Sequence, residues 1–275
     1  MKKRTSLLLL IALICLTGFS QNSNILVKGS DTCLPLLQKE SEQYHNDHPE
    51  SSVTVIGGGS GVGLTSLAAG TTDIAMSSRI LSLEEKVKLL HDGNTYQEKI
   101  FAKDALSVIV HPSNKIDKLT REQLEAIFTG KITNWKELGG EDMPIIVYSR
   151  ETSSGSYAFF KEHVLNGKNF TPAALLIPAT GAMVQSLSQT RGGIGYSGIA
   201  YVRRDVKTLA LSFDSGKTYV LPASKTVQDN SYPIARPLYL YYFTKSQDKV
   251  QKFMDFIFSA KGQEIVQNVG YIPIN

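Results

Sequence analysis

Several classes of protein are excluded by what this sequence has little of. Its 275 residues contain two cysteines and one tryptophan. Two cysteines cannot build the disulfide framework of a small secreted scaffold. The single long apolar run lies near the N-terminus, which excludes a membrane protein with several spans. With 42% hydrophobic and 20% charged residues, the composition is that of a globular protein with one large domain or two moderate ones.

Motifs that mark common enzyme classes are incomplete. Gly130-Lys131 lacks the upstream glycine and the following hydroxyl residue of a phosphate-binding P-loop. The glycine-rich stretch 57–63 does not have the spacing of a dinucleotide site. Ser60 and Ser197 are flanked by glycines, but neither completes the elbow around a nucleophilic serine. We therefore expect a protein that is not an enzyme, with no catalytic residues and no cofactor.

The five histidines offer no clear metal site or catalytic base. His45 and His48 are the only close pair, and they lie at the polar end of a predicted helix. We interpret them as solvent-exposed surface residues rather than as metal ligands, so no metal is expected. The lack of a base histidine also argues against a serine hydrolase.

The N-terminus has the pattern of a secretory signal. Three basic residues at positions 2–4 precede an apolar run, 7–16, that is too short to span a bilayer well. Small residues then stand where a signal peptidase reads, and we place cleavage after Ser20. The alternatives are an uncleaved anchor and lipidation of Cys15. Lipidation is disfavoured because Ile14 is bulky where a lipoprotein signal has a small residue.

Cleavage would change both the charge and the cysteine count. Removing three basic residues lowers the formal net charge from +4 to about +1. A near-neutral protein is not expected to bind nucleic acid by neutralising its phosphates. A small anion stays compatible with this charge, because backbone and hydroxyl dipoles can hold it. Cys33 would be the one cysteine left, and its place before an apolar helix favours a buried small residue over a reactive thiol.

Strands and helices alternate along the rest of the chain, which predicts an α/β architecture. Two helices begin at capping boxes, Ser82 with Glu85 and Thr120 with Gln123. Strands are predicted at 25–28, 51–56, 73–76, 105–110, 144–148, 193–196 and 235–243. Helices are predicted from Thr32 to about 46 and at 61–69, 82–90, 120–128, 154–165, 182–189, 246–258 and 260–269.

Two of these helices carry more detailed expectations. Thr32 is a plausible N-cap, with Pro35 tolerated in the first turn that follows it. In the helix that begins at Ser82, the spacing of Leu83, Val87 and Leu90 predicts that these three side chains face inward.

The α/β pattern stops at His111-Pro112 and then restarts, which indicates two lobes. The last strand and the two helices after it have no obvious place in the second section. We therefore expect the chain to cross to a second lobe near residue 111 and to return near 233. The predicted division is a signal peptide at 1–20, lobe 1 at 21–110 with 233–275, and lobe 2 at 111–232.

Hydroxyl and glycine residues recur where a strand gives way to a helix. Four such clusters occur, at 29–32, 57–61, 77–79 and 150–156. A helix N-terminus exposes free N–H groups and a partial positive charge, and serine and threonine add hydroxyl donors. In an α/β fold these turns gather at the carboxyl ends of strands, where ligands bind. Any one cluster could be only a helix cap, but four together favour a shared site for an oxyanion.

Two arginines stand beside these clusters. Arg79 and Arg150 each offer a planar fork that matches two oxygens of phosphate or sulfate. The alternative for each is a surface salt bridge, for example between Arg150 and Glu151.

At these residues the sequence resembles the periplasmic phosphate-binding proteins of bacterial ABC phosphate importers, which are type II solute-binding proteins. The Phe-Thr-Gly-Lys-Ile-x-x-Trp string at 128–135 and the Arg-x-x-x-Ser-Gly-Ser string at 150–156 are the most specific parts. The other matching segments are 29–32, 57–63, 73–79 and 192–196. They follow the family order and cover almost the whole chain after the signal.

The resemblance implies a two-lobed periplasmic-binding-protein-like α/β fold that closes on one phosphate in the cleft between its lobes. It further implies a periplasmic monomer that delivers phosphate to an ABC permease in the inner membrane. The ligand-binding residues that it implies, together with those that the turn clusters suggest, are Ser30, Asp31, Thr32, Ser60, Ser78, Arg79, Arg150, Ser154, Gly155 and Ser156.

One position departs from the family pattern. Members of another branch carry an aspartate in the third loop, where it accepts a hydrogen bond from the protonated phosphate. Here Ser78 and Arg79 stand at that place, so Asp31, Asp104 and Glu151 remain as candidate acceptors. The departure keeps another oxyanion, such as sulfate, molybdate or a phosphonate, open as the ligand. A phosphatase and a sensor or adhesin on the same fold are further alternatives.

Overall fold

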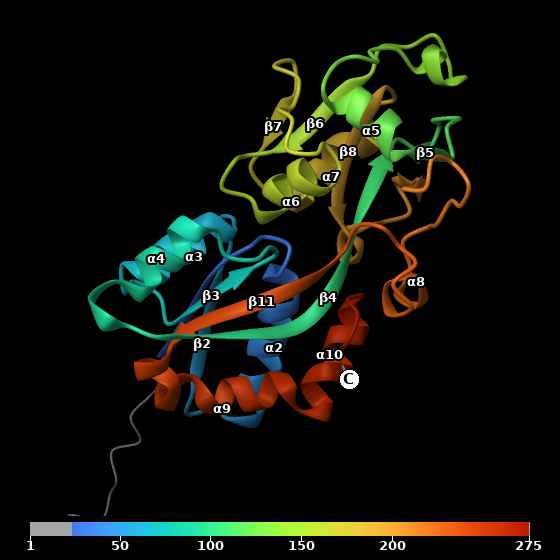
Figure 1. Cartoon of the computed structure of the whole chain (residues 1–275). Coiled ribbons are helices and arrows are strands. Elements are labelled where there is room, and N and C mark those ends of the chain that lie inside the picture. The colour runs from blue at the N-terminus through green and yellow to red at the C-terminus, as the bar shows by residue number, and fades with distance from the viewer. Residues whose placement is uncertain (1–23, 275) are drawn as a thin grey trace, which may run out of the picture.

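The computed structural model describes residues 24–274, and these form two lobes that share one strand (Figure 1). The predicted signal peptide and Cys15 lie outside these residues. Nine strands form one sheet, in the order β2-β1-β3-β11-β4-β8-β6-β7, with β9 paired to β4. The strand that both lobes share is β4 (Tyr96–Val110): its first part pairs with β11 and its last part with β8 and β9.

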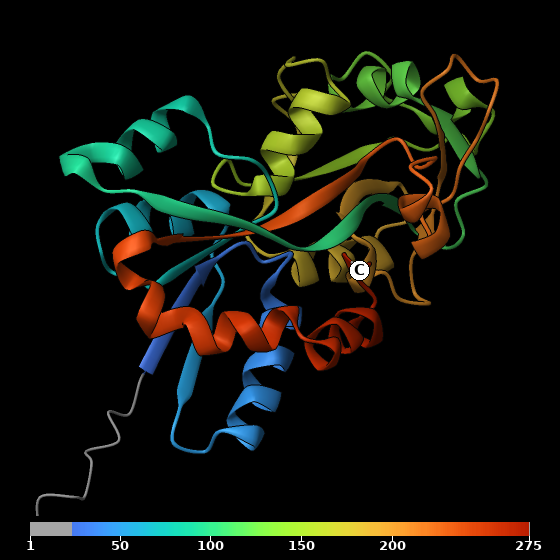
Figure 2. The same cartoon turned by 60° about the horizontal axis from the view of Figure 1, so that its bottom comes forward.

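The first lobe is built on the half of the sheet that contains β2, β1, β3 and β11. Strands β1, β2 and β3 run parallel, and β11 returns antiparallel between β3 and β4. Helices α2, α9 and α10 pack on one face, and α3 and α4 on the other (Figure 2). The elements are β1 (Asn24–Gly29), α2 (Leu34–Asp47), β2 (Ser52–Ile56), α3 (Ser60–Ala68), β3 (Ile74–Ser77), α4 (Leu83–Leu90), β11 (Ala235–Phe243), α9 (Gln247–Phe258) and α10 (Ala260–Val269).

The second lobe repeats the α/β plan on the other half of the sheet. A core of aromatic and aliphatic side chains, with Phe128, Phe160 and Tyr196 in contact, lies under α5 and α6, while α7 covers the opposite face. The elements are β5 (Lys118–Thr120), α5 (Arg121–Phe128), β6 (Ile146–Arg150), α6 (Gly155–His163), β7 (Leu175–Ile177), α7 (Thr180–Gln189), β8 (Gly193–Gly198), β9 (Lys207–Thr208), β10 (Ala210–Ser212) and α8 (Ser224–Gln228).

Most predicted elements are present, and both capping boxes form as expected. Ser82 caps α4 and Thr120 caps α5, each by accepting a hydrogen bond from the backbone N–H three residues on. The prediction that Thr32 caps α2 is wrong. The N-cap is Cys33, which makes no side-chain cap, and the Thr32 hydroxyl contacts Ser156 of the other lobe.

The predicted inward face of α4 is also wrong. Leu83, Val87 and Leu90 are 79%, 61% and 51% exposed, and Leu89 is the residue that packs inward. The helix follows the loop after β3, whose Leu81 already fills the core beside Leu89, so the helix is turned with its other apolar side to solvent.

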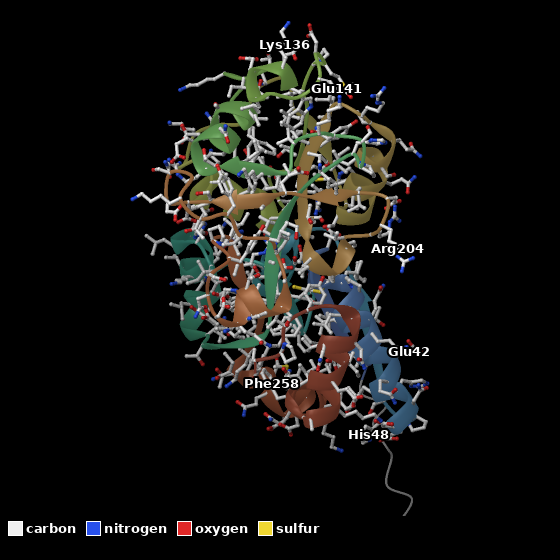
Figure 3. All side chains as sticks on the ribbon, turned by 90° about the vertical axis from the view of Figure 1, so that its right-hand side faces the viewer. Glu42, His48, Lys136, Glu141, Arg204 and Phe258 are labelled. Atoms are coloured by element: carbon white, nitrogen blue, oxygen red, sulfur yellow. The ribbon has the colours of Figure 1, made fainter. Side chains whose placement is uncertain are left out.

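Two further expectations concern cysteine and histidine. Cys33 is buried as predicted, and burial raises the pKa of its thiol to about 12, so it stays unreactive at neutral pH. His45 is exposed as expected, whereas His48 is half-buried and lies at the end of the molecule opposite Lys136 (Figure 3). Among the described residues, no helix is both long and apolar enough to cross a membrane.

Candidate functional site

Three serine hydroxyls of the first lobe meet where its parallel strands end. Ser30 follows β1, Ser60 begins α3 after β2, and Ser78 follows β3. Ser30 Oγ lies 3.0 Å from Ser78 Oγ, and Ser60 Oγ lies 3.5 Å from it. We call these three residues the hydroxyl cluster. Parallel strands place their carboxyl ends along one edge, which is why residues 18 and 48 positions apart come together here.

The second lobe faces this cluster with a helix N-terminus. Ser154 caps α6 by accepting from the N–H groups of Ser156 and Tyr157. Gly155, the first helical residue, approaches so closely that a Cβ atom there would lie 2.3 Å from Ser60 Oγ and 2.6 Å from Ser78 Oγ. A side chain at this position would require both hydroxyls to move, so the close approach favours glycine. The positive end of the α6 dipole therefore points at the hydroxyl cluster.

A second contact joins the lobes two residues after Ser30 and one residue after Gly155. Thr32 Oγ1 of the first lobe lies 3.1 Å from Ser156 Oγ of the second. Both side chains are buried. Together with Ser154, Gly155 and the hydroxyl cluster they form what we call the interlobe site.

Arg150 lies at the edge of this site, and four of its five N–H groups have acceptors. Nη2 donates to Asp31 Oδ2 of the first lobe at 2.6 Å and to the carbonyl of Pro178. Nη1 donates to Thr180 Oγ1, and Nε to a backbone carbonyl. The side chain is 3% exposed, so the alternative of a surface pair with exposed Glu151 does not hold.

Arg79 is not brought to the interlobe site. Its guanidinium makes a two-pronged ion pair with Glu85 of α4, with both distances 2.7 Å. Hydrogen bonding to this carboxylate raises the pKa of Arg79 above its ordinary value. The same carboxylate accepts from the backbone N–H of Ser82, so Arg79 strengthens the start of α4. We leave Arg79 out of the site.

The sequence reasoning missed Arg236, which lies in the interlobe site. It stands at the start of β11, and its Nη2 donates to Ser156 Oγ at 2.9 Å and to Thr32 Oγ1 at 3.3 Å. Its Nε and Nη2 also donate to Asp104 Oδ2 at 3.0 and 2.9 Å. The sequence did contain a signal for Arg236: it is a single arginine inside a strand of aromatic and aliphatic residues. A charge buried in such a strand requires a partner.

The three candidate carboxylates lie in different environments. Glu151 is exposed. Asp104 is wholly buried, and its oxygens accept from Arg236 and from the N–H of Ile199. Asp31 accepts one hydrogen bond on each oxygen, from Arg150 and from the N–H of Gly58. Asp31 therefore keeps more of its acceptor capacity than Asp104.

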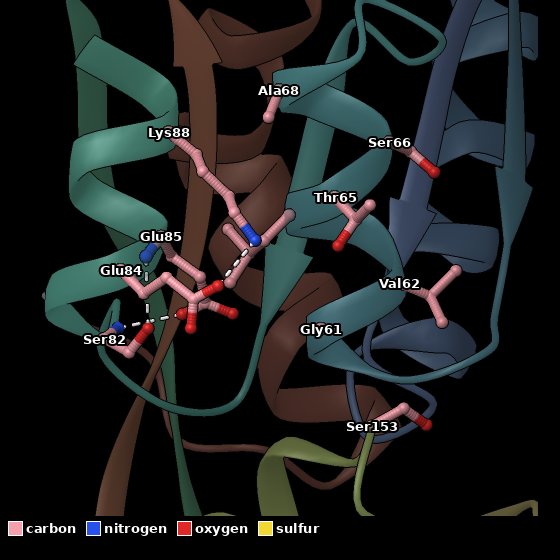
Figure 4. Close-up of a pocket in the computed structure, with 11 residues that line it drawn as sticks. Gly61, Val62, Thr65, Ser66, Ala68, Ser82, Glu84, Glu85, Lys88 and Ser153 are labelled. Atoms are coloured by element: carbon pink, nitrogen blue, oxygen red, sulfur yellow. Dashed lines mark hydrogen bonds and ion pairs between the residues drawn. The ribbon is translucent and has the colours of Figure 1, made fainter. Parts of the chain in front are cut away.

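A surface groove lies beside the interlobe site. It measures about 460 Å³ and runs between α3 and α4, with Ser153 of the second lobe at one end (Figure 4). Its charged lining residues, Glu84, Glu85 and Lys88, are engaged in pairs or caps. It holds neither Arg150 nor Arg236, so the donors suited to an anion lie elsewhere.

The arrangement of the interlobe site suits a small dehydrated anion. Hydroxyls, the positive ends of α3 and α6 and two buried guanidiniums face the site from both lobes. Within residues 24–274, no three His, Cys, Asp or Glu side chains are placed to hold a metal ion. The Tyr196 hydroxyl accepts a hydrogen bond from the backbone N–H of Arg150. Burial raises the pKa of this hydroxyl to about 12 and keeps it neutral.

Comparison with known proteins agrees with this geometry. Residues 18–261 match a family model described as the PBP superfamily domain. The phosphate-binding protein PstS of Borreliella burgdorferi is 32% identical over 285 residues, covering 100% of this chain and 99% of the relative. The chain belongs to the PstS family of the PBP superfamily. The predicted family and the two-lobed α/β fold are therefore confirmed.

Solved structures of family members are also similar to this chain in three dimensions. A putative phosphate ABC transporter substrate-binding protein from Clostridium perfringens, solved with bound phosphate, superposes with a TM-score of 0.84 at 31% identity, covering 92% of this chain and 100% of that chain. An ABC-type phosphate transport receptor from Vibrio cholerae gives 0.73 at 30% identity over 90% and 99%. These relatives are named for binding and transport, in agreement with the prediction that the chain is not an enzyme.

Proposed function

We propose that this chain is a solute-binding protein that takes up inorganic phosphate between its lobes and delivers it to an ABC importer. The observation that carries the proposal is the interlobe site. Buried hydroxyls of the first lobe, the N-terminus of α6 and two buried arginines converge there, where an anion would bridge both lobes. The ligand-binding residues that we propose are Ser30, Asp31, Thr32, Ser60, Ser78, Arg150, Ser154, Gly155 and Ser156.

Asp31 is the residue that we propose to distinguish phosphate from sulfate. At neutral pH phosphate carries a proton that a carboxylate oxygen can accept, whereas sulfate has none to offer. Asp31 fits this part because it borders the interlobe site and has acceptor capacity to spare. With such an acceptor, phosphate is favoured over the other oxyanions that the sequence leaves open.

Binding is coupled to closure in this proposal. An anion touching both lobes gains its full binding energy only when they are together, so it shifts the population towards the closed state. The division into 21–110 with 233–275 and 111–232 stays a proposal. It is supported by a core most of whose buried members lie within 111–232, the others being residues of the shared strand β4, Ile234 and Ile272.

The partner that we propose is the permease of the importer in the inner membrane, and we propose a periplasmic monomer released by cleavage after Ser20. The exposed apolar face of α4 supports a partner, because solvent-facing leucine and valine side chains grouped on one face are typical of interaction sites. It borders the α3–α4 groove, where Ser153 of the second lobe also lies, so a partner there would contact both lobes when they are closed.

Calorimetric titration of the ligand-stripped mature protein tests the binding proposal. We expect about micromolar or tighter phosphate affinity and no heat from sulfate. Arg150→Ala should lose most of the affinity, because it removes a buried charged donor. Binding of both ions would contradict the role of Asp31, and binding of neither would contradict the function.

Uptake measurements test the partner. Leu83→Ser combined with Val87→Ser should leave phosphate affinity unchanged but lower phosphate uptake by cells that express the variant. Exposed Leu221, on the second lobe, offers a matched control as Leu221→Ser. Unchanged uptake in the α4 variant would remove this face from the contact with the permease. Mass spectrometry of the exported protein would separate cleavage after Ser20 from lipidation at Cys15.

A further inference from the structure

Arg236 lies where the two connections between the lobes run side by side. It opposes Asp104 in the antiparallel pairing of β11 with β4. In Figure 1 these two strands are the ones that pass along the first lobe towards the second. The ion pair of Arg236 with Asp104 therefore sits at the hinge, with side-chain exposures of 1% and 0%.

The guanidinium reaches both halves of the interlobe site from this position. Nη2 donates to Thr32 of the first lobe and to Ser156 of the second. Arg150 also pairs across the lobes, but all three of its nitrogens already have acceptors. Arg236 is thus the guanidinium that touches the hydroxyl groups of both lobes.

One edge of this guanidinium lacks an acceptor. Nε and Nη2 face Asp104, while Nη1 is buried and makes no hydrogen bond within the described part of the chain. A buried charged donor without an acceptor is destabilising, so a guanidinium needed only for the ion pair would be expected to find a partner for each nitrogen. The side chain also lines a cavity of about 270 Å³ between the lobes, and its charged carbon lies 5.4 Å above the Phe159 ring.

We propose that Arg236 is a second anion-binding arginine, which donates from Nη1 to the phosphate and ties the ligand to the hinge. The inference rests on the proposed function. It adds a ligand contact that comes neither from the N-terminus of a helix nor from a loop at the end of a strand. Asp104 balances its charge as Asp31 balances Arg150, so the site presents two arginines to the anion without a large excess of positive charge.

The matched pair Arg236→Met and Arg79→Met tests this assignment. Both substitutions remove one guanidinium from the same cavity, but Arg79 makes no contact with the interlobe site. With radioactive inorganic phosphate in equilibrium dialysis, we expect Arg236→Met to weaken binding about 100-fold and Arg79→Met less than about threefold. Equal, small effects would overturn the proposal.

Two further variants serve as controls for a loss of folding. Arg236→Met combined with Asp104→Asn removes the carboxylate that would otherwise stay buried without its partner, and Arg236→Lys keeps the charge beside Asp104. We expect both to melt cooperatively and to bind phosphate at least about tenfold more weakly than the wild type. Wild-type affinity in either folded variant overturns the proposal. Failure of the wild type itself to bind phosphate would instead contradict the proposed function.

Discussion

Arg150 donates a 2.6 Å hydrogen bond to the carboxylate of Asp31, and the two residues belong to different lobes. The pair can exist only while the lobes are together. It therefore stabilises the closed arrangement by itself, and an anion entering the site meets a guanidinium whose charge is already balanced. The carboxylate then has two effects, to repel a fully ionised anion and to accept a proton from a partly ionised one.

Replacing this carboxylate should alter selectivity. We expect Asp31→Asn to raise the affinity for sulfate relative to phosphate, because the repulsion is removed and an amide can donate where the carboxylate could only accept. Titration with each ion at pH 7 measures the ratio. Glu151→Gln is the matched control, since it removes an exposed carboxylate from the loop before α6. An unchanged ratio in Asp31→Asn would mean that the acceptor is another residue.

Adding one methyl group at Gly155 should weaken phosphate binding strongly. A Cβ atom there would overlap the hydroxyls of Ser60 and Ser78, so the lobes could not reach their closed contact. We expect Gly155→Ala to lower phosphate affinity more than about 100-fold while the protein stays folded. Gly181→Ala is the control: it adds the same group near the start of α7, where the nearest atom is 3.9 Å away. Wild-type affinity in Gly155→Ala would show that closure does not need this contact.

Glu40 should make stability depend on pH. It is wholly buried in α2, neither carboxylate oxygen has a partner among the described residues, and burial raises its pKa from 4.5 to about 9. The folded state therefore holds a proton that the unfolded state releases between these two values. The contribution of protonated Glu40 to the free energy of unfolding is fully present below about pH 4.5. It is lost as the pH rises towards about 9.

The variant Glu40→Gln should lack this dependence. We expect its free energy of unfolding, relative to the wild type, to increase by about 1.4 kcal/mol for each pH unit in that window. Urea unfolding at pH 5 and pH 8 measures the difference. Glu42→Gln alters an exposed carboxylate on the same helix and should show little change. Parallel pH profiles for Glu40→Gln and the wild type would mean that Glu40 ionises normally.

The cap of α4 should matter for stability alone. Ser82 accepts from the N–H of Glu85 and lies outside the interlobe site. We expect Ser82→Ala to lower the free energy of unfolding by about 1 kcal/mol and to leave phosphate affinity unchanged. Chemical denaturation and titration on the same preparation give both quantities. A marked loss of affinity would indicate that α4 helps to hold Ser78 in place.

Local signals in the sequence predicted the elements and most of the candidate site. Hydroxyl and glycine residues at strand ends pointed to the interlobe site, because parallel strands bring such turns together whatever lies between them. Arg79 and Arg150 looked alike in sequence. Only the fold shows that Glu85 holds Arg79 on its own lobe while Asp31 draws Arg150 across. Arg236 was missed because its acceptor, Asp104, lies 132 positions away in the chain.

The outward face of α4 could not be read from spacing either. Periodicity shows that Leu83, Val87 and Leu90 share a side of the helix, but not which side the core occupies. A partner surface and a buried face give the same pattern, since both need apolar residues one turn apart. The neighbouring Leu81 and Leu89 fill the core, and this is a property of tertiary packing.

The strand β4 runs unbroken through both lobes, with hydrogen-bonded neighbours along almost its whole length. A loose linker would let the lobes tumble relative to each other, and a ligand would have to suppress that freedom on binding. A paired ribbon restricts relative motion to bending and twisting about one line. The open state is thereby already low in conformational entropy, so less of the affinity for the anion is lost to ordering the protein.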